Sequence, residues 1–521
     1  MPDKRAFFVP RTSEKGRHQS FDQAFEGEYV FRKYLGGSDP QSRLNAYNTA
    51  TAELQGIIGD CLQSGTTLRA RGSLWSLSRA AVTDGRLIDT KLLRIAFNFP
   101  ADQVDANYAG DSDKLRFIEC GASIDSISRY LFRDGLSLKA SGSNNGQTLA
   151  GALSTGTHGG AFNVGALPEM VAGLHLVVGP NKHVYLERAS HPVMKPGFAQ
   201  ALGAEFIQDD TLFNAALVSF GSFGIIHGIM IEARELFVLN ALRFNHPYNA
   251  ALKTAINTLD LGGLQLPAEA ANIPKDKPYH FEIFYNPNEG TPPDEAIVIL
   301  MYEGPWDASY EAPEWDADDP GMGASGLEVM GALLDLIPSP LNKLVVPMLN
   351  DQVADKFEPY VKTGVIRDLF RGEVTLGKTM ACGIGLPLDR AEEALNIAFK
   401  IYEDSGDVLP ILLSHRFVKG TDALLGFTRF DTTAVLEIDS INMDSTQDYL
   451  RQVWEGLDAA SIPFTLHWGK FNSFLNAARV RDRYGDTAVD QWISARETLL
   501  ESAEVRQVFT NPFIRQLGLA T

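Results

Sequence analysis

The stretch GSNNGQTLAGALSTGTHGGAFNVG, residues 142–165, decides the fold of this chain. It holds seven glycines in 24 residues, where the average of 46 in 521 would give about two. Closely spaced glycines let backbone N–H groups approach a diphosphate, because no Cβ intervenes. A set of tight turns in a surface loop explains the glycines at least as well. Glycine content alone therefore leaves both interpretations open.

A second loop of small residues lies closer to the N-terminus. Residues 67–72, TLRARG, are typical of a strand and run into Arg71-Gly72-Ser73-Leu74-Trp75-Ser76. The Gly and the two Ser could form a second anion-holding turn, although on its own an ordinary strand-to-loop turn is the better interpretation. Neither G-x-x-x-x-G-K-[ST] nor a G-x-G-x-x-G after a strand occurs. The sequence therefore excludes a P-loop and a Rossmann cradle.

Composition narrows the function further. Asp and Glu number 65 against 46 Lys and Arg, for a net charge of −19. So acidic a chain repels phosphate backbones, and without a basic patch we expect no nucleic-acid partner. The three cysteines, Cys61, Cys120 and Cys382, lie far apart and predict neither a disulfide framework nor a metal site. No run of 18 apolar residues and no apolar N-terminal segment occur, so we expect no transmembrane helix and a cytoplasmic location.

Hydrophobic spacing predicts two large α+β units. Residues 54–62 keep helical spacing up to Gly65, and Ser123 is a suitable cap for a helix over residues 124–131. Residues 170–187 predict a hairpin turning at Pro180-Asn181. Beyond about residue 240, strands such as PILLSHRFVKG and AVLEIDSINM alternate with helices, which predicts an antiparallel sheet with helices on one side. Residues 1–40 are polar and predict an irregular arm.

Together the two loops resemble the vanillyl-alcohol-oxidase-type (PCMH) family of FAD-linked oxidoreductases. The glycine-rich stretch matches the family pattern S-x-x-x-x-T-x-x-G-x-x-x-T-G-T-H-G, and FGSFGII (220–226) matches a third segment. The C-terminal HWGK (467–470) and FTNPFIRQLGL (509–519) are similar to the aldonolactone, alditol and sterol oxidase branch. The resemblance implies that FAD is bound by Arg71, Gly72, Ser73, Leu74, Trp75, Ser76, Ser143, Thr148, Gly151, Thr155, Gly156, Thr157, His158, Gly224, Ile225 and Lys470.

One departure from the family pattern concerns how FAD is held. Many members attach FAD covalently through a His in a G-S-G-H-S loop, whereas Trp75 occupies that position here. Members with a second attachment use a Cys downstream of the glycine loop, and no Cys lies between Cys120 and Cys382. The indole nitrogen acts only as a donor. The resemblance therefore implies non-covalent FAD.

Two neighbouring strands of the second unit supply candidate catalytic residues. Because strands alternate faces, Ser414 shares a face with Arg416, and Glu437 shares one with Asp439. If the strands pair, a guanidinium and two carboxylates converge and could orient a hydroxyl or take its proton. A solvated sheet face with an ion pair is the alternative. Related polyol oxidases carry E-x-R where this chain has Ser414 and Arg416, so the carboxylate role is expected to move to Glu437.

The HWGK segment supplies two more catalytic candidates. In the family this segment meets the flavin ring, so the resemblance implies that Lys470 stabilises negative charge on the reduced ring and that His467 assists. Alternatively, His467 is a structural residue and Lys470 a surface one.

The sequence therefore predicts an α+β, two-domain PCMH-type fold whose α/β substrate domain is built on an antiparallel sheet. Its parts are an N-terminal arm (1–41), an FAD-binding domain (42–236), a substrate domain (237–460) and a C-terminal segment returning to the FAD domain (461–521). The expected reaction is oxidation of a CH–OH group by hydride transfer to flavin N5, with O₂ or another electron acceptor. A nicotinamide-driven flavin reductase or ene-reductase and a non-catalytic flavin-binding protein are the alternatives.

An apolar stretch interrupts the second unit. Residues 303–350 form an insertion, and residues 326–349 within it are apolar between Gly and Pro positions. This pattern fits a lid over the substrate site, or equally an ordinary buried helix pair. A lid would favour a bulky, largely apolar small-molecule substrate over a small polyol.

Overall fold

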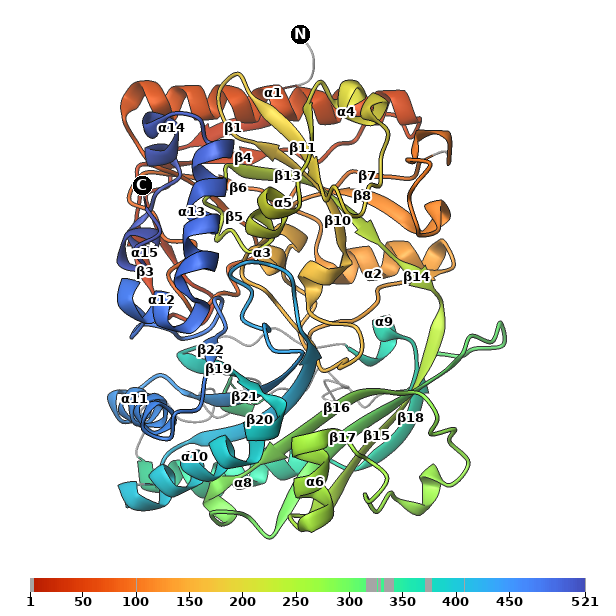
Figure 1. The fold of residues 1–521 in the computed structure, drawn as a ribbon, viewed down its shortest axis with the longest axis vertical. Helices are drawn as coiled ribbons and strands as arrows, with labels where there is room; N and C mark the ends of the chain where they lie inside the picture. The colour runs from red at the N-terminus through yellow and green to blue at the C-terminus, as the bar shows by residue number, and fades with distance from the viewer. Residues whose placement is uncertain are drawn as a thin grey trace.

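In the computed structural model, residues 4–520 are described except 100, 315–325, 327–328, 332–341, 371–376 and 407. Figure 1 shows two parts stacked along the long axis. The upper part holds the N-terminal half together with the C-terminal helices, and the lower part is built on one large sheet. Among the described residues, no helix is long and apolar enough to cross a membrane.

Two predicted helices begin and end where their caps require. Helix α1 (Pro40–Ser64) starts after Asp39, whose side chain accepts a hydrogen bond from the Ser42 N–H, and ends at Gly65 in the left-handed conformation. Helix α2 (Ile124–Arg133) starts after Ser123, whose hydroxyl accepts from the Ser126 N–H. Both helices bury one apolar face, as their spacing predicts.

The upper part contains two sheets. Four strands pair in the order β1 (Ala6–Val9), β4 (Gly27–Phe31), β6 (Arg86–Asp89) and β5 (Leu68–Arg71). Six strands pair in the order β12 (Glu205–Gln208), β11 (His183–Glu187), β10 (Val171–Val177), β13 (Ile225–Glu232), β8 (Leu115–Glu119) and β7 (Ala96–Phe97). The predicted hairpin is β10 with β11. A short pair, β9 (Leu136–Ser137) and β14 (Arg234–Glu235), completes this part.

The expectation of an irregular N-terminal arm is wrong. Strands β1 and β4 belong to the four-stranded sheet, and β2 (Ser13–Lys15) pairs with β3 (Asp22–Ala24) in a hairpin. Arg5 is buried and ion-pairs with Glu119 of β8 at 2.9 Å. These strands are only three to five residues long, so their alternation is too short to reveal them in the sequence.

The lower part is one antiparallel sheet, as predicted. Its order is β18 (Tyr360–Gly364), β15 (Phe237–Pro247), β17 (Glu295–Pro305), β16 (Pro278–Tyr285), β20 (Ile411–Lys419), β21 (Thr432–Ile441), β19 (Thr379–Pro387) and β22 (Thr465–Leu466). Helices α10 (Ala391–Ser405) and α11 (Asp444–Ala459) cover one face, where apolar side chains such as Leu413 and Leu436 point. The opposite face carries the candidate catalytic residues, because side chains alternate along each strand.

The C-terminal segment packs against the upper part. Helix α13 (Asp486–Leu499) lies against α5 (Asp210–Leu217), and the Trp492 indole donates to the Val218 carbonyl at 3.0 Å. The other helices are α3 (Leu149–Ser154), α4 (Pro196–Leu202), α6 (Ala250–Thr258), α8 (Asn342–Lys356), α9 (Ile366–Leu369), α12 (Ala477–Tyr484), α14 (Ala503–Val508) and α15 (Pro512–Gln516).

Much of the expected lid, 326–349, lies outside the described residues. Of its described part, Gly326 lies against Asp439, since a Cβ on Gly326 would be 2.4 Å from Asp439 Oδ2. Val329 and Met330 are buried in a cluster with Ile441 on the same sheet face. Whether the whole stretch is a lid stays a prediction.

Candidate active site

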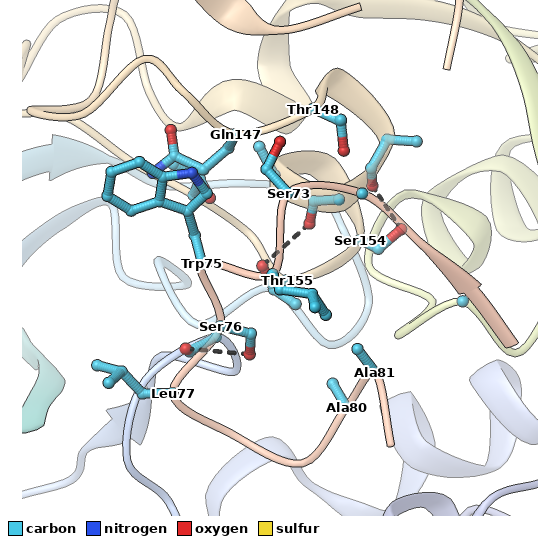
Figure 2. A pocket seen from close by; sticks show the side chains of 18 of the residues that line it. Ser73, Trp75, Ser76, Leu77, Ala80, Ala81, Gln147, Thr148, Ser154 and Thr155 are labelled. Atoms are coloured by element: carbon cyan, nitrogen blue, oxygen red, sulfur yellow. Dashed lines mark hydrogen bonds between the residues drawn. The ribbon is translucent and has the colours of Figure 1, made fainter. Parts of the chain in front are cut away.

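A pocket of about 1460 Å³, measured to its open mouth, lies between the two parts. The upper part contributes three loops, 69–77, 142–158 and 220–226, and the lower part contributes β20 and β21. Figure 2 shows Ser73, Trp75 and Ser76 on one of these loops, with Gln147, Thr148 and Thr155 beside it. Loops predicted to bind one ligand therefore meet in space.

Two glycines allow the first two loops to pack closely. A Cβ on Gly72 would lie 2.0 Å from Thr148 Oγ1, and one on Gly146 would lie 2.8 Å from the Trp75 ring. Real Cβ atoms essentially never approach so closely, so both positions need glycine. Backbone of the two loops is thereby brought together at the pocket wall, and this suits a ligand bound through main-chain N–H groups.

Most of the predicted cofactor-binding residues line this pocket. The lining includes Arg71, Gly72, Ser73, Leu74, Trp75, Ser76, Ser143, Thr148, Gly151, Thr155, Thr157, His158, Gly224 and Lys470. Two predicted residues are not part of the lining. Gly156 instead makes a turn with φ 71°, and Ile225 points into the core, so its neighbour Ile226 on the opposite strand face lines the pocket.

The Arg71 side chain forms ion pairs with carboxylates of the protein and is therefore not available to a ligand in the pocket. Its guanidinium ion-pairs with Glu28 and, at 3.2 Å, with Asp89. It also lies 3.5 Å from Glu14. An anion in the pocket would therefore contact the backbone of Arg71 and not its guanidinium group.

The strand pairing predicted for the lower part is present. In the β20–β21 register Ser414 lies opposite Glu437 and Leu412 opposite Asp439. Ser414, Arg416, Glu437 and Asp439 therefore share the face that meets the pocket. The last three line it together with His467 and Lys470, so all five predicted catalytic residues converge there.

Glu437 is the ionic centre of this cluster. Its carboxylate lies 2.5 Å from Lys470 Nζ, 3.1 Å from His158 Nε2 and 4.0 Å from Arg416 Nη1. Burial alone would raise the pKa of Glu437, but Lys470, Arg416 and His158 outweigh burial and hold it well below its ordinary value. Glu437 is therefore ionised over the working pH range.

Asp439 differs from Glu437 although it lies two residues further along the same strand. Burial, with the nearby charge of Glu437, raises the pKa of Asp439 to about 7 against the lowering effect of Lys470. Its Oδ1 atom is buried and has no hydrogen-bond partner among the described residues, and the same holds for the Ser414 hydroxyl. Of the two residues, Asp439 lines the pocket, so its Oδ1 atom is left for a ligand.

The local backbone fixes the tautomer of His467. Its Nδ1 accepts a hydrogen bond from the Gly469 N–H at 2.9 Å. Burial, His158 and Lys470 lower its pKa well below the ordinary value, so the ring is neutral. A neutral imidazole that accepts at Nδ1 carries its proton on Nε2. His467 can therefore donate a hydrogen bond to a ligand but cannot act as the base.

Sequence reasoning missed a carboxylate on the next strand. Glu282 of β16 lies opposite Arg416 and accepts from its Nε at 2.5 Å. His280 Nε2 lies 3.2 Å from Glu282 Oε2. Burial would lower the pKa of Arg416, but Glu282 and Glu437 raise it. The strand residues PYHFEIFY show the alternation, but only the sheet order reveals that Glu282 reaches Arg416.

A second missed residue comes from the N-terminal hairpin. His18 lies in the loop between β2 and β3, is 1 % exposed and lines the pocket near Trp75. No sequence signal connected this polar segment with the loops about 55 and 125 residues downstream.

Comparison with known proteins agrees with this geometry. Residues 46–184 match the family model of an FAD binding domain. The L-gulono-1,4-lactone dehydrogenase of Mycobacterium tuberculosis is 24% identical over 477 residues, covering 90% of this chain and 94% of that protein. The cholesterol oxidase of B. sterolicum superposes with a TM-score of 0.67 at 12% identity, covering 99% and 98% of the chains. A VAO-type flavoprotein of Myceliophthora thermophila superposes with a TM-score of 0.58 at 10% identity, covering 92% and 78%.

The chain therefore has the vanillyl-alcohol-oxidase-type fold and carries an FAD binding domain. It is an FAD-dependent oxidoreductase. The pocket fits the cofactor, since the loops that pack together at Gly72 and Gly146 line it with backbone and small side chains. Lys470 and His467 also line the pocket and offer a cation and an N–H donor there.

Proposed function

We propose that this enzyme oxidises a CH–OH group of a neutral, hydroxylated small molecule. When bound, FAD supplies the hydride acceptor at flavin N5. The observation that carries the proposal is the buried Asp439 Oδ1 atom, which belongs to a side chain that lines the pocket and has no hydrogen-bond partner among the described residues. A substrate hydroxyl would satisfy it, and buried polar groups are almost always satisfied.

Asp439 is the proton acceptor in this proposal. A base works best when its pKa is close to the operating pH, and the pKa of Asp439 is raised to about 7. Glu437, which was predicted from the sequence to have this role, is a weaker base because its pKa is held well below the ordinary value. Glu437 instead positions Lys470 and Arg416, both of which it contacts.

The other residues orient the substrate and stabilise charge. Arg416, held by Glu282, binds the substrate oxygen, and the Nε2–H of His467 donates to the ligand side of the pocket. Lys470 stabilises negative charge that develops during reduction, which is the logic of an oxyanion hole. FAD is held without a covalent bond, because Trp75 stands where relatives carry the attaching His.

Charge balance favours a neutral substrate. Lys470 is paired with Glu437 and Arg416 with Glu282, so neither cation is free to hold a carboxylate. The unpartnered Asp439 oxygen and the Nε2–H of His467 suit hydroxyl groups better than an apolar body. A sugar-like lactone or polyol therefore fits these contacts better than the bulky apolar alcohol suggested by the insertion.

Anaerobic mixing of the holoenzyme with candidate compounds tests the proposal. The panel contains aldonolactones, polyols, a sterol and a long-chain alcohol, and bleaching of the oxidised-flavin band is followed. We expect bleaching by a hydroxylated lactone or polyol, with loss in Asp439→Asn. Preferential bleaching by the sterol or long-chain alcohol would overturn the substrate class, and bleaching by NADPH alone would indicate a reductase. Admission of air after bleaching then shows whether O₂ is the acceptor.

A further inference from the structure

His18 stands at the boundary between the two parts of the molecule. It lies in the loop of the β2–β3 hairpin, and its Nδ1 is 3.0 Å from the Thr379 hydroxyl at the start of β19. In the β19–β21 register Ala381 lies opposite Asp439 and Gly383 opposite Glu437. Thr379 therefore shares their face, two residues beyond Ala381. The contact places His18 beside the row of candidate catalytic residues, although it belongs to the N-terminal hairpin.

The loop that carries His18 also contacts the segment that carries Trp75. The Arg17 N–H donates to the Leu74 carbonyl at 3.4 Å, and its guanidinium lies 4.7 Å from the centre of the Trp75 ring. The His18 ring lies 5.9 Å from Trp75, tilted by 59°. Residues 16–18 therefore fasten the loop that carries Trp75 to the first strand residue of β19.

The chemistry of His18 is that of an uncharged ligand-binding group. Burial, with a smaller contribution from the Arg17 charge, lowers its pKa to about 4, so the ring is neutral at physiological pH. Its Nδ1 is engaged by Thr379, whereas Nε2 makes no hydrogen bond within the described part of the chain. Since His18 lines the pocket, Nε2 is the nitrogen left for a bound molecule.

The position of His18 in the pocket indicates which part of FAD its Nε2 atom would contact. The ring of the cofactor must reach the face of Asp439 and Glu437 if it is to react there, and the loops of the upper part would then hold the ADP half. His18 stands next to that face through Thr379. We propose that His18 is a flavin-binding residue that hydrogen-bonds the isoalloxazine ring through Nε2, and that the Gly16–His18 loop retains the ring in the pocket.

Three substitutions of His18 distinguish the contribution of its Nε2 atom from that of its Nδ1 atom. His18→Phe keeps a flat ring beside Trp75 and removes both nitrogens. His18→Gln places an amide nitrogen near the position of Nε2, and His18→Asn places one near Nδ1. His415→Phe is the matched control, because His415 is also buried, has a pKa lowered to about 3 by burial, and lies on the helix-covered face of the sheet.

The readouts are independent of turnover. The holoenzyme is diluted and FAD release is followed by recovery of flavin fluorescence, and the full-length chain stripped of FAD is titrated with riboflavin and, separately, with ADP. Losing one hydrogen bond weakens binding by about 3- to 10-fold. We expect this loss for FAD and riboflavin in His18→Phe and His18→Asn and near wild-type binding in His18→Gln. ADP binding should be unchanged in all three, and His415→Phe should bind all ligands as wild type does.

Three results would overturn the proposal. They are wild-type riboflavin affinity in His18→Phe, equal losses of ADP and riboflavin affinity, or an Asn variant that binds riboflavin better than the Gln variant. If the Phe variant fails to fold, the comparison of Gln with Asn still decides, since both are polar and differ only in where they place the nitrogen. The outcome does not depend on which alcohol the enzyme oxidises.

Discussion

Ser414 on β20 lies directly opposite Glu437 on β21, so a hydroxyl faces the carboxylate that ion-pairs with Lys470. Strand β20 itself therefore brings no carboxylate to the pocket face. The acidic groups there come from β21 and from Glu282 on β16. With Glu437 bound to cations, Asp439 is the carboxylate left for proton transfer.

The rate of flavin reduction should rise with pH through about 7. Asp439 accepts a proton only when ionised, and its pKa is raised to about 7, so the fraction of competent enzyme grows from pH 6 to pH 8 and then levels off. Stopped-flow reduction at saturating substrate measures this profile. Asp439→Asn should lose the rising limb and about 10²- to 10⁴-fold in rate. The same limb persisting in the Asn variant would assign the base elsewhere.

Replacing Lys470 by Met should slow flavin reduction far more than it weakens FAD binding. The positive charge acts on negative charge that appears only during the reaction, and loss of one such group costs about 10²-fold or more in rate. Stopped-flow reduction and FAD titration are compared for the same preparation. Lys400→Met, on the exposed surface of α10, serves as the control. Equal losses in rate and affinity would contradict the assigned role.

The flavin should leave the protein on acid denaturation. Trp75 offers only an N–H donor, and its ring packs against the backbone of Gly146 rather than presenting a nucleophile. Acid precipitation followed by centrifugation should leave the yellow colour in the supernatant. Flavin fluorescence retained by the washed polypeptide would instead demonstrate a covalent link, and His18, the imidazole near Trp75, would be the first residue to replace.

Acid should destabilise the upper part through His175. Its Nδ1 lies 2.6 Å from the Tyr47 hydroxyl and its Nε2 2.8 Å from His183, and burial lowers its pKa well below the ordinary value. In the unfolded chain the His175 imidazole binds a proton near pH 6.5, whereas in the folded chain it stays neutral. The free energy of unfolding therefore falls as pH drops below about 6.5, by up to about 1.4 kcal/mol per pH unit.

Urea unfolding of wild type and His175→Gln between pH 7.5 and pH 5.5 isolates this contribution. The variant should show a shallower decline, because glutamine does not titrate. Identical slopes in wild type and His175→Gln would contradict the prediction.

The sequence predicted the parts of the molecule whose patterns are local. The end of α1 at Gly65, the Ser123 cap of α2, the β10–β11 hairpin and the shared face of Glu437 and Asp439 all follow from spacing within one segment. The family resemblance brought the three loops to one pocket. Glu282 and His18 were missed because each reaches the site through sheet order or through a hairpin of three-residue strands, and neither leaves a signal in its own neighbourhood.

The Leu77 N–H donates to the Gly469 carbonyl at 2.8 Å, joining the first cofactor loop to a segment near the C-terminus. During synthesis these partners leave the ribosome almost 400 residues apart. The pocket is therefore completed only after residues 467–470 have been made. Until then proteases and chaperones act on a chain that has no complete site for its cofactor, and FAD can stabilise the fold only from that point on.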